Sequence, residues 1–153
     1  MKAATDSEAL ITFGEQITKT MRYSRDDIAR FARLSGDENP LHTDVALAQR
    51  ARFGEIIASG QQTAAALMGL LATHFSRADD GLARQMLCLN MNFAFKEPVF
   101  AEQDITLLWR VSAVTPNAKL LGLIANLDGH ASVVKGKRAV VARGTILVSA
   151  AAP

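Results

Sequence analysis

Residues 60–75 read GQQTAAALMGLLATHF, and this stretch decides how the rest of the chain folds. It predicts an α-helix that begins after Ser59, a residue type that commonly caps helix N-termini. From Ala64 to Ala72 the helix is apolar on almost every side, and such a helix has to be buried all round. In a chain of 153 residues, another layer of structure must therefore wrap it.

The second half of the chain supplies β-strands for that wrapper. Residues 86–95 alternate with period two, which predicts a half-buried strand whose apolar members are Leu87, Leu89, Met91, Phe93 and Phe95. Further strands are predicted over residues 105–113 and 121–127, with turns at residues 115–118 and at Asp128-Gly129. Residues 133–148 are β-prone and form either one long bent strand or a hairpin that turns at Lys135-Gly136.

The segment before the central helix carries helix start and stop signals. An extended lead-in covers residues 11–23, and Ser24 then begins a helix through a capping-box variant with Asp27. Gly36 ends that helix, because glycine readily adopts the left-handed conformation of a helix C-terminus. Asp44 caps a second, short helix from Val45 to about Arg50.

Helices followed by a run of strands with short turns indicate the α+β class, and not alternating βαβ units. The simplest packing is a long, twisted antiparallel sheet wrapped around the long central helix. We expect a single domain over residues 1–153, with its core at about residues 20–149 and no internal repeat or linker. The sheet must have edges, and edge pairing in a dimer is one way to satisfy them.

Composition limits the function classes. Hydrophobic residues make up 49% and charged residues 21%, as in an ordinary globular protein, and the net charge of +2 is too small to indicate nucleic-acid binding. The apolar run at residues 64–72 is too short to span a bilayer, and no basic-then-apolar leader opens the chain, so we expect a cytoplasmic protein without membrane attachment. The single cysteine, Cys88, excludes a disulfide framework and is expected to be buried.

The candidate chemistry lies at residues 35–42, which read SGDENPLH. Asp37 and His42 are five residues apart, and Asn39-Pro40 between them forces turn or extended geometry, so a stiff loop presents both groups. The helix start at Gly60 offers free backbone N–H groups to a developing negative charge. An acid, a base and an anion hole form an enzyme-like set, although the same loop can also serve only as a capped turn.

The stretch from Ser35 to Asp44 resembles the MaoC-like dehydratase family, which includes the (R)-specific enoyl-CoA hydratases. The resemblance extends over roughly residues 20–148 and includes residues 24–33, 53–60, 92–100 and 128–136. It implies a hot-dog fold, with the sheet wrapped around the long central helix. It also implies homodimers or higher homo-oligomers that bind an acyl-CoA or acyl-carrier-protein thioester near the subunit interface.

The activity that the resemblance implies is a hydro-lyase reaction of fatty acid metabolism, the reversible addition of water at the C2–C3 bond of an enoyl thioester. By motif position, Asp37 and His42 become the catalytic pair and the N–H of Gly60 an oxyanion donor. Asn39 would hold the loop or the water, and Ser59, which replaces a histidine common in the family, would shape the substrate pocket. The resemblance implies no cofactor, because coenzyme A enters only as a part of the substrate.

Alternatives remain at this stage. A hot-dog acyl-CoA thioesterase and a non-catalytic acyl-thioester-binding module use the same fold and ligand. A metal site built from Asp37, Asn39, His42 and Asp44 is a poor zinc set, and we expect no metal. His74 is expected to be structural and His130 to lie solvated in a turn. A basic cluster is either a solvated face or a contact for the phosphates of coenzyme A; it consists of Lys135, Lys137, Arg138 and Arg143. The same phosphates could also contact Arg50, Arg52 or Lys96.

Overall fold

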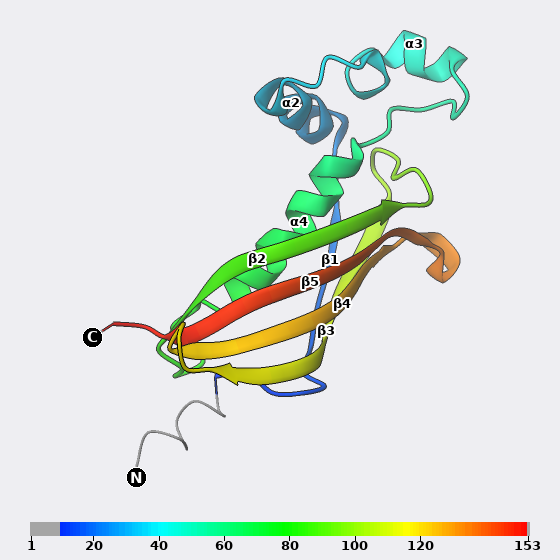
Figure 1. Ribbon diagram of the computed structural model, residues 1–153. Coiled ribbons are helices and arrows are strands. Elements are labelled where there is room, and N and C mark those ends of the chain that lie inside the picture. The colour runs from blue at the N-terminus through cyan, green and yellow to red at the C-terminus, as the bar shows by residue number, and fades with distance from the viewer. Residues whose placement is uncertain (1–9, 153) are drawn as a thin grey trace.

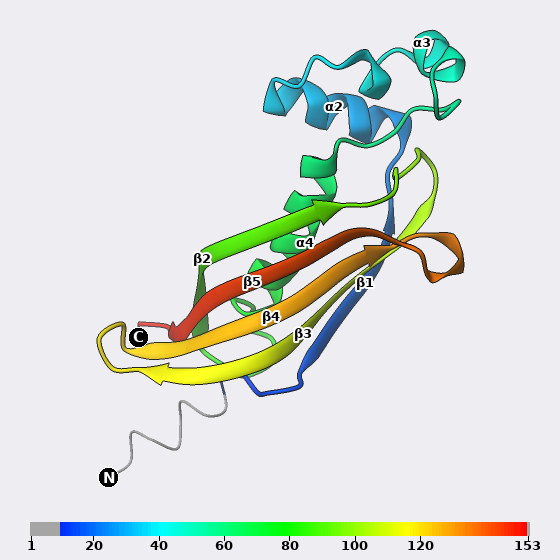
Figure 2. The same ribbon diagram turned by 45° about the vertical axis from the view of Figure 1, so that its right-hand side comes forward.

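The computed structural model describes residues 10–152. A five-stranded antiparallel sheet with the strand order β1-β3-β4-β5-β2 curls around the helix α4, as Figures 1 and 2 show from two directions. The elements in chain order are β1 (Gln16–Arg22), α2 (Arg25–Ser35), the 3₁₀ turn η1 (Pro40–His42), α3 (Val45–Arg50), α4 (Gly60–His74), β2 (Arg84–Phe95), β3 (Asp104–Asn117), β4 (Gly122–Ser132), the 3₁₀ turn η2 (Val134–Gly136) and β5 (Arg138–Ala150). The predicted α+β class, with the sheet around one helix, is confirmed.

Helix α2 begins and ends where its capping residues predict. The Ser24 hydroxyl accepts from the N–H of Asp27 at 3.0 Å, and the Asp27 carboxylate accepts from the N–H of Ser24 at 3.0 Å. These hydrogen bonds lower the pKa of Asp27. Gly36 ends the helix at φ 74°, in the left-handed conformation. The chain then turns directly into Asp37, so the caps decide where that carboxyl group enters the fold.

The indole of Trp109 on β3 joins the sheet to the central helix. Its ring is fully buried, and its Nε1–H donates to the backbone oxygen of Leu67 on α4 at 2.8 Å. Gly129 is its partner across the β3–β4 ladder, where an added Cβ would lie 2.3 Å from the indole Cε3. The prediction of a turn at Asp128-Gly129 is therefore wrong. Glycine is present there because only a residue without a side chain leaves room for the indole.

Two further turn predictions have different outcomes. The prediction of a turn at residues 115–118 is wrong, because β3 continues to Asn117 and pairs Pro116 with Leu123. The chain reverses instead over residues 118–121. The alternative turn at Lys135-Gly136 is confirmed, and it joins β4 to β5 with both residues at positive φ.

His130 does not lie in a turn either. It occupies β4, where it pairs with Val141 and is only partly exposed. Burial, together with the neighbouring Arg138, lowers the pKa of its imidazole. The expectation of a solvated turn histidine is therefore wrong.

Strand β2 departs from simple alternation. A bulge between Cys88 and Asn90 inserts one residue into the strand. Even-numbered residues therefore face the core before the bulge, and odd-numbered residues face it after the bulge. Met86 before the bulge packs on the core, as do Met91 and Phe93 after it. Leu87, Leu89 and Phe95 are 62%, 47% and 57% exposed, and Cys88 is exposed as well, which corrects the expectation that these side chains are buried. An edge strand of the sheet thus presents apolar surface.

Helix α4 is covered on one side only within this chain. Leu67 and Leu71 are fully buried against the sheet, whereas Ala65, Gly69 and Ala72 are exposed. The prediction of burial all round is therefore wrong for the single chain, since the curled sheet covers one face of the helix. No helix within residues 10–152 is both long enough and apolar enough to span a bilayer.

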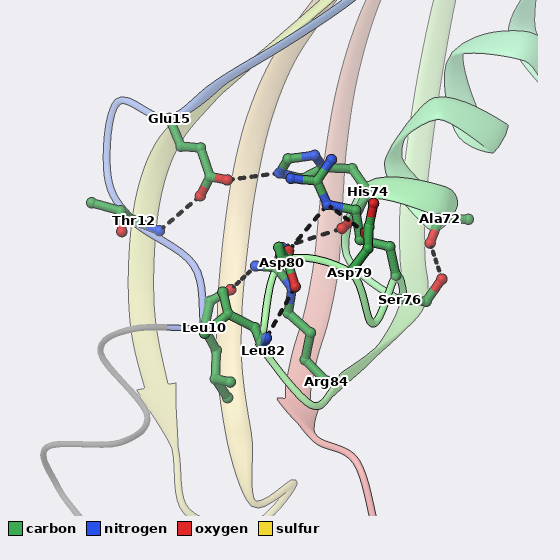
Figure 3. A network of polar contacts seen from close by, with 11 residues as sticks. Leu10, Thr12, Glu15, Ala72, His74, Ser76, Asp79, Asp80, Leu82 and Arg84 are labelled. Carbon is green, nitrogen blue, oxygen red and sulfur yellow. Dashed lines mark hydrogen bonds and ion pairs between the residues drawn. The ribbon is translucent and has the colours of Figure 1, made fainter.

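A polar network anchors the C-terminal end of α4, drawn in Figure 3. His74 Nε2 lies 2.7 Å from Glu15 Oε1, which gives the histidine the structural setting expected for it. The buried guanidinium of Arg84 lies 2.5 Å from Asp80, donates to the backbone oxygens of His74 and Leu10, and stacks 5.0 Å from the Phe75 ring centroid. The network ties the segment before β1, the end of α4 and the start of β2 together.

Candidate active site

Helix α2 lies beyond one end of the sheet, next to the start of α4 (Figure 1). Asp37 follows the C-terminal end of α2, and His42 is the last residue of η1. His42 Nε2 is 3.4 Å from Asp37 Oδ2. The imidazole is buried, and its Nδ1 lies 2.6 Å from the backbone oxygen of Ile57. The Asp37 carboxyl retains partial exposure, so it faces solvent and the imidazole at once.

The contact with Ile57 decides which ring nitrogen of His42 carries a proton. A carbonyl oxygen only accepts hydrogen bonds, so Nδ1 must be the donor. The neutral ring then presents a lone pair at Nε2, and this lone pair faces an Asp37 oxygen that also accepts. Two hydrogen-bond acceptors 3.4 Å apart repel each other unless a hydrogen atom lies between or beside them. One water molecule satisfies both, because each of its two O–H groups can donate to one of the acceptors.

The backbone of the loop and one side chain hold the Asp37 carboxylate. The N–H of Asn39 donates to Oδ1 at 3.1 Å, and the amide of Gln61 donates to Oδ2 at 3.2 Å. The side chain of Asn39 accepts from the N–H of Leu41 at 3.1 Å, so it stabilises the loop. Sequence reasoning missed Gln61. Its position directly after Gly60, in the first turn of the helix, was the signal that could have found it.

Ser59 and Gly60 form the N-terminus of α4. The Ser59 hydroxyl caps the helix by accepting from the N–H of Gln62 at 3.3 Å, as predicted. Gly60 is the first helical residue, and such a position has no acceptor within its own helix. The ring of Phe95 packs so closely on Gly60 that an added Cβ would lie 2.7 Å from two ring carbons.

A cavity of about 270 Å³ opens beside this helix start. Its walls come from the N-terminus of α4, the segment before it, and the end of β2, and they include Ser59, Gly60, Thr63, Phe53, Phe95 and Lys96. Asp37 and His42 are not among the lining residues. Gln61 connects the two parts, because it follows Gly60 and donates to Asp37.

The other candidate residues are placed as follows. Within residues 10–152, no three His, Cys, Asp or Glu side chains are grouped closely enough to hold a metal ion. Of the basic residues, Lys96 lines the cavity, Lys137 pairs with Glu97 at 4.0 Å, and Arg143 pairs with Asp128 on neighbouring strands. Two of the four clustered basic residues, Lys137 and Arg143, are thus in separate ion pairs, and none of the four lines this cavity.

A sheet curled around one helix, with an acid–imidazole loop at the helix N-terminus, defines a hot-dog protein of the kind the loop motif implied. The profile described as MaoC like domain matches residues 9–121, and the chain therefore belongs to the MaoC-like family.

Several known proteins with similar sequences or structures carry hydratase or dehydratase names. An (R)-specific enoyl-CoA hydratase of Aeromonas caviae is 29% identical over 129 residues, which cover 83% of this chain and 92% of that protein. The mitochondrial 3-hydroxyacyl-(acyl-carrier-protein) dehydratase FERN of Solanum lycopersicum is 25% identical over 103 residues, covering 67% and 58%. The solved structure of an (R)-hydratase from A. caviae involved in PHA biosynthesis has a TM-score of 0.76 at 27% identity, covering 89% and 96%.

Proposed function

We propose that this protein is a hydro-lyase that adds water to, or removes it from, the C2–C3 bond of an enoyl or 3-hydroxyacyl thioester, as an (R)-specific enoyl-CoA hydratase does. The observation that carries the proposal is the pair of acceptors, His42 Nε2 and Asp37 Oδ2, held 3.4 Å apart beside the N-terminus of α4. Relatives named as a hydratase and a dehydratase support it.

In the proposed mechanism, one water molecule donates its two hydrogens to Asp37 and to His42 Nε2. Its oxygen attacks C3 of the enoyl thioester while Asp37 takes one proton, so a C–O bond forms and the C2–C3 π electrons move toward the thioester oxygen. The N–H of Gly60 donates to that oxygen, and one such donor contributes about 3 kcal/mol to transition-state stabilisation. The enolate then collapses and C2 receives a proton from the same pair, so the elements of one water are added.

The remaining site residues have binding roles in this proposal. Ser59 and Phe95 shape the entry to the cavity beside Gly60, and Asn39 keeps the loop closed through its contact with Leu41. Lys96 is the cavity's cationic wall and is our candidate for a coenzyme A phosphate contact. The reaction needs no cofactor beyond the coenzyme A or acyl-carrier-protein moiety of the substrate itself.

We also propose that one hot-dog domain spans residues 1–153 and that it works as a homodimer. The exposed side chains of Leu87, Leu89 and Phe95 on an edge strand support this, because long apolar edges otherwise pair nonspecifically. Phe95 also lines the cavity, so the same strand serves both the contact and the site. Light scattering of Leu89→Lys should give a monomer where the unaltered chain gives a dimer, and a monomeric unaltered chain contradicts the proposal.

The test of the activity is hydration of crotonyl-CoA and longer enoyl-CoAs by Asp37→Asn and His42→Gln. Each variant should lose roughly a hundredfold or more in kcat, the usual contribution of a placed proton-transfer group. Glu38→Gln is the matched control, because this exposed carboxylate lies in the same loop. Unchanged turnover in Asp37→Asn rejects the assignment. Thiol release from a saturated acyl-CoA, detected with DTNB, would instead indicate the thioesterase, and saturable binding without any reaction would indicate the binding module.

A further inference from the structure

A second cleft lies on the surface between α2 and the end of β1, and none of the roles proposed above uses its side chains. Its volume is about 790 Å³, and its apolar walls come from Met21, Phe31 and Leu34. Leu34 is 87% exposed, more than any other large hydrophobic side chain within residues 10–152. Helix α2 projects beyond one end of the sheet, as Figures 1 and 2 show, so this apolar surface is open to a large partner.

Guanidinium groups give the same cleft a net positive charge. Arg22, Arg30 and Arg33 line it, together with one carboxylate, that of Asp27. Asp27 accepts from the N–H of Ser24 at 3.0 Å, so its charge is already engaged at the N-terminal end of α2. Arg33 lies in the last turn of that helix and takes part in none of the ion pairs formed within residues 10–152.

The other two arginines are only weakly held by their present partners. Arg30 lies 3.9 Å from Asp26, and the two side chains are 70% and 73% exposed. Arg22 lies 2.9 Å from Asp104, and these side chains are 53% and 63% exposed. Exposed ion pairs contribute only about 0–1 kcal/mol, so acidic groups that approach the cleft can compete for both guanidinium groups.

The lining has the composition of a protein–protein contact. Methionine, aromatic residues and arginine are enriched at protein interfaces, whereas lysine and glutamate are depleted there. The cleft presents Met21, Phe31 and the three arginines, and no lysine or glutamate within residues 10–152 lines it. A matching occupant combines apolar side chains with carboxylates, as an acidic amphipathic helix of another protein does. A second copy of this chain matches less well, because its net charge is +2.

We propose that this cleft docks an acidic helix of an acyl-carrier protein, which brings the acyl group to the reaction centre on its flexible arm. The inference rests on the proposed function, since it selects the carrier of that same thioester. Complementary charges on the two proteins accelerate their encounter and disfavour partners with basic surfaces. The exposed side chain of Leu34 is the apolar contact that the partner would bury.

A carrier protein needs no channel from the cleft to the reaction centre, because its arm extends outside the docked domain. Arg33 is four positions before Asp37, or about 6 Å along a helix, and a phosphopantetheine arm is considerably longer than that. In the first turn of α4, Gln62 lines the cleft and Gly60 lines the cavity described above. Gln61, between them, donates to Asp37. The cleft, the carboxyl group and the cavity therefore follow one another around the same helix start.

Calorimetric titration with an apo acyl-carrier protein, which lacks the arm, tests the docking surface without requiring turnover. The unaltered protein should bind it, and Arg33→Glu and Leu34→Ser should each raise Kd about tenfold. Leu121→Ser is the matched apolar control, since Leu121 is 83% exposed in the turn between β3 and β4. Arg110→Glu is the matched charge control, in an exposed arginine on β3 about 20 Å from Arg22 along the sheet. Both controls should retain the affinity.

Hydration of crotonyl-CoA and of crotonyl-acyl-carrier protein by the same variants connects docking with the reaction. Arg33→Glu should lower kcat/KM for the carrier-protein thioester about tenfold, through KM. It should leave kcat/KM for crotonyl-CoA within twofold, because the smaller thioester does not need the cleft.

Absence of binding to the apo carrier protein, or binding that is as strong in Arg33→Glu and Leu34→Ser, overturns the inference. Equal losses in the control variants overturn it as well, because they indicate nonspecific attraction. A smaller assembly of Leu34→Ser in light scattering, without carrier binding by the unaltered protein, would assign the cleft to a second copy instead.

The two proposals can fail separately. Hydration of crotonyl-CoA without carrier binding leaves the proposed function standing and rejects the docking surface. Carrier binding that depends on Arg33, without hydration of either thioester, keeps the docking surface and rejects the proposed reaction.

Discussion

Within residues 10–152, the amide of Gln61 is the one side-chain donor that contacts the Asp37 carboxylate, and its removal gives a sharp test of the site. In Gln61→Leu the Oδ2 atom that faces His42 loses its 3.2 Å donor, while Oδ1 keeps the N–H of Asn39 at 3.1 Å. The carboxylate can then rotate about the remaining hydrogen bond. We expect the water that the proposed mechanism places between Asp37 and His42 to be bound less often in the reactive position.

The size of the effect follows from the contact. A hydrogen bond to a charged group contributes about 1.5–3 kcal/mol, which corresponds to roughly ten- to a hundredfold in rate. Gln61 is exposed, so water can replace part of what its amide provides, and the lower end applies. We therefore expect kcat to fall about tenfold while KM changes little. Gln61→Glu should be worse, because it sets a second carboxylate beside Asp37.

The assay is steady-state hydration of crotonyl-CoA, followed by the loss of enoyl absorbance, with thermal unfolding measured on the same samples. Since Gln61 is an exposed helix residue, Gln61→Leu should leave the melting temperature almost unchanged. Gln49→Leu, at an exposed position on α3, is the matched control and should keep full activity. A kcat within twofold of the unaltered protein, or a loss that appears equally in Gln61→Leu and Gln49→Leu, refutes the positioning role.

Three further predictions concern stability. Gly129→Ala should lower the free energy of unfolding in urea by about 3 kcal/mol, because its Cβ would overlap the indole of Trp109. The control Gly69→Ala, with nothing within 4 Å of an added Cβ, should cost no stability. A loss below about 1 kcal/mol for Gly129→Ala contradicts the prediction. The lowered pKa of His130 means that the unfolded chain takes up its proton first, so stability should fall as the pH drops through about 6.5. His130→Gln should flatten that slope, and an unaltered slope would show that another group causes it. Arg84→Met should destabilise by about 3 kcal/mol, because the backbone oxygens of Leu10 and His74 lose their buried donor and Asp80 keeps only its 3.1 Å ion pair with Arg77. A calorimetric melt within about 1 °C of the original would contradict the role of the network.

Much of the fold was predictable because local chemistry acts over a few residues. Ser24 and Gly36 bound α2, and Asp44 caps α3, through contacts between residues at most four apart. The predicted start of α4 after Ser59 is confirmed for the same reason. Local signals also failed in recognisable ways. Asp128-Gly129 has the composition of a turn, yet Gly129 serves an indole from another strand.

The candidate site divides in the same way. The spacing of Asp37 and His42 around Asn39-Pro40 was visible in the sequence, and the structure brings the two side chains together. The contact between Gln61 and Asp37 was not visible, since 24 positions separate the two residues. The bulge in β2, which exposes Leu87 and Leu89, could not be predicted either. Apolar and polar residues keep alternating in the sequence through the bulge, so the pattern does not mark it.

The sequence by itself determined the helix ends, the apolar central helix, the sheet that has to cover it and the loop that carries an acid and an imidazole. These features follow from backbone propensity, capping and hydrophobic periodicity, which depend on near neighbours. The tertiary structure alone decided the protonated nitrogen of His42 and the support of Asp37 by Gln61. Each of these depends on atoms that only packing brings within hydrogen-bonding distance or removes from water, and no local pattern along the chain records that.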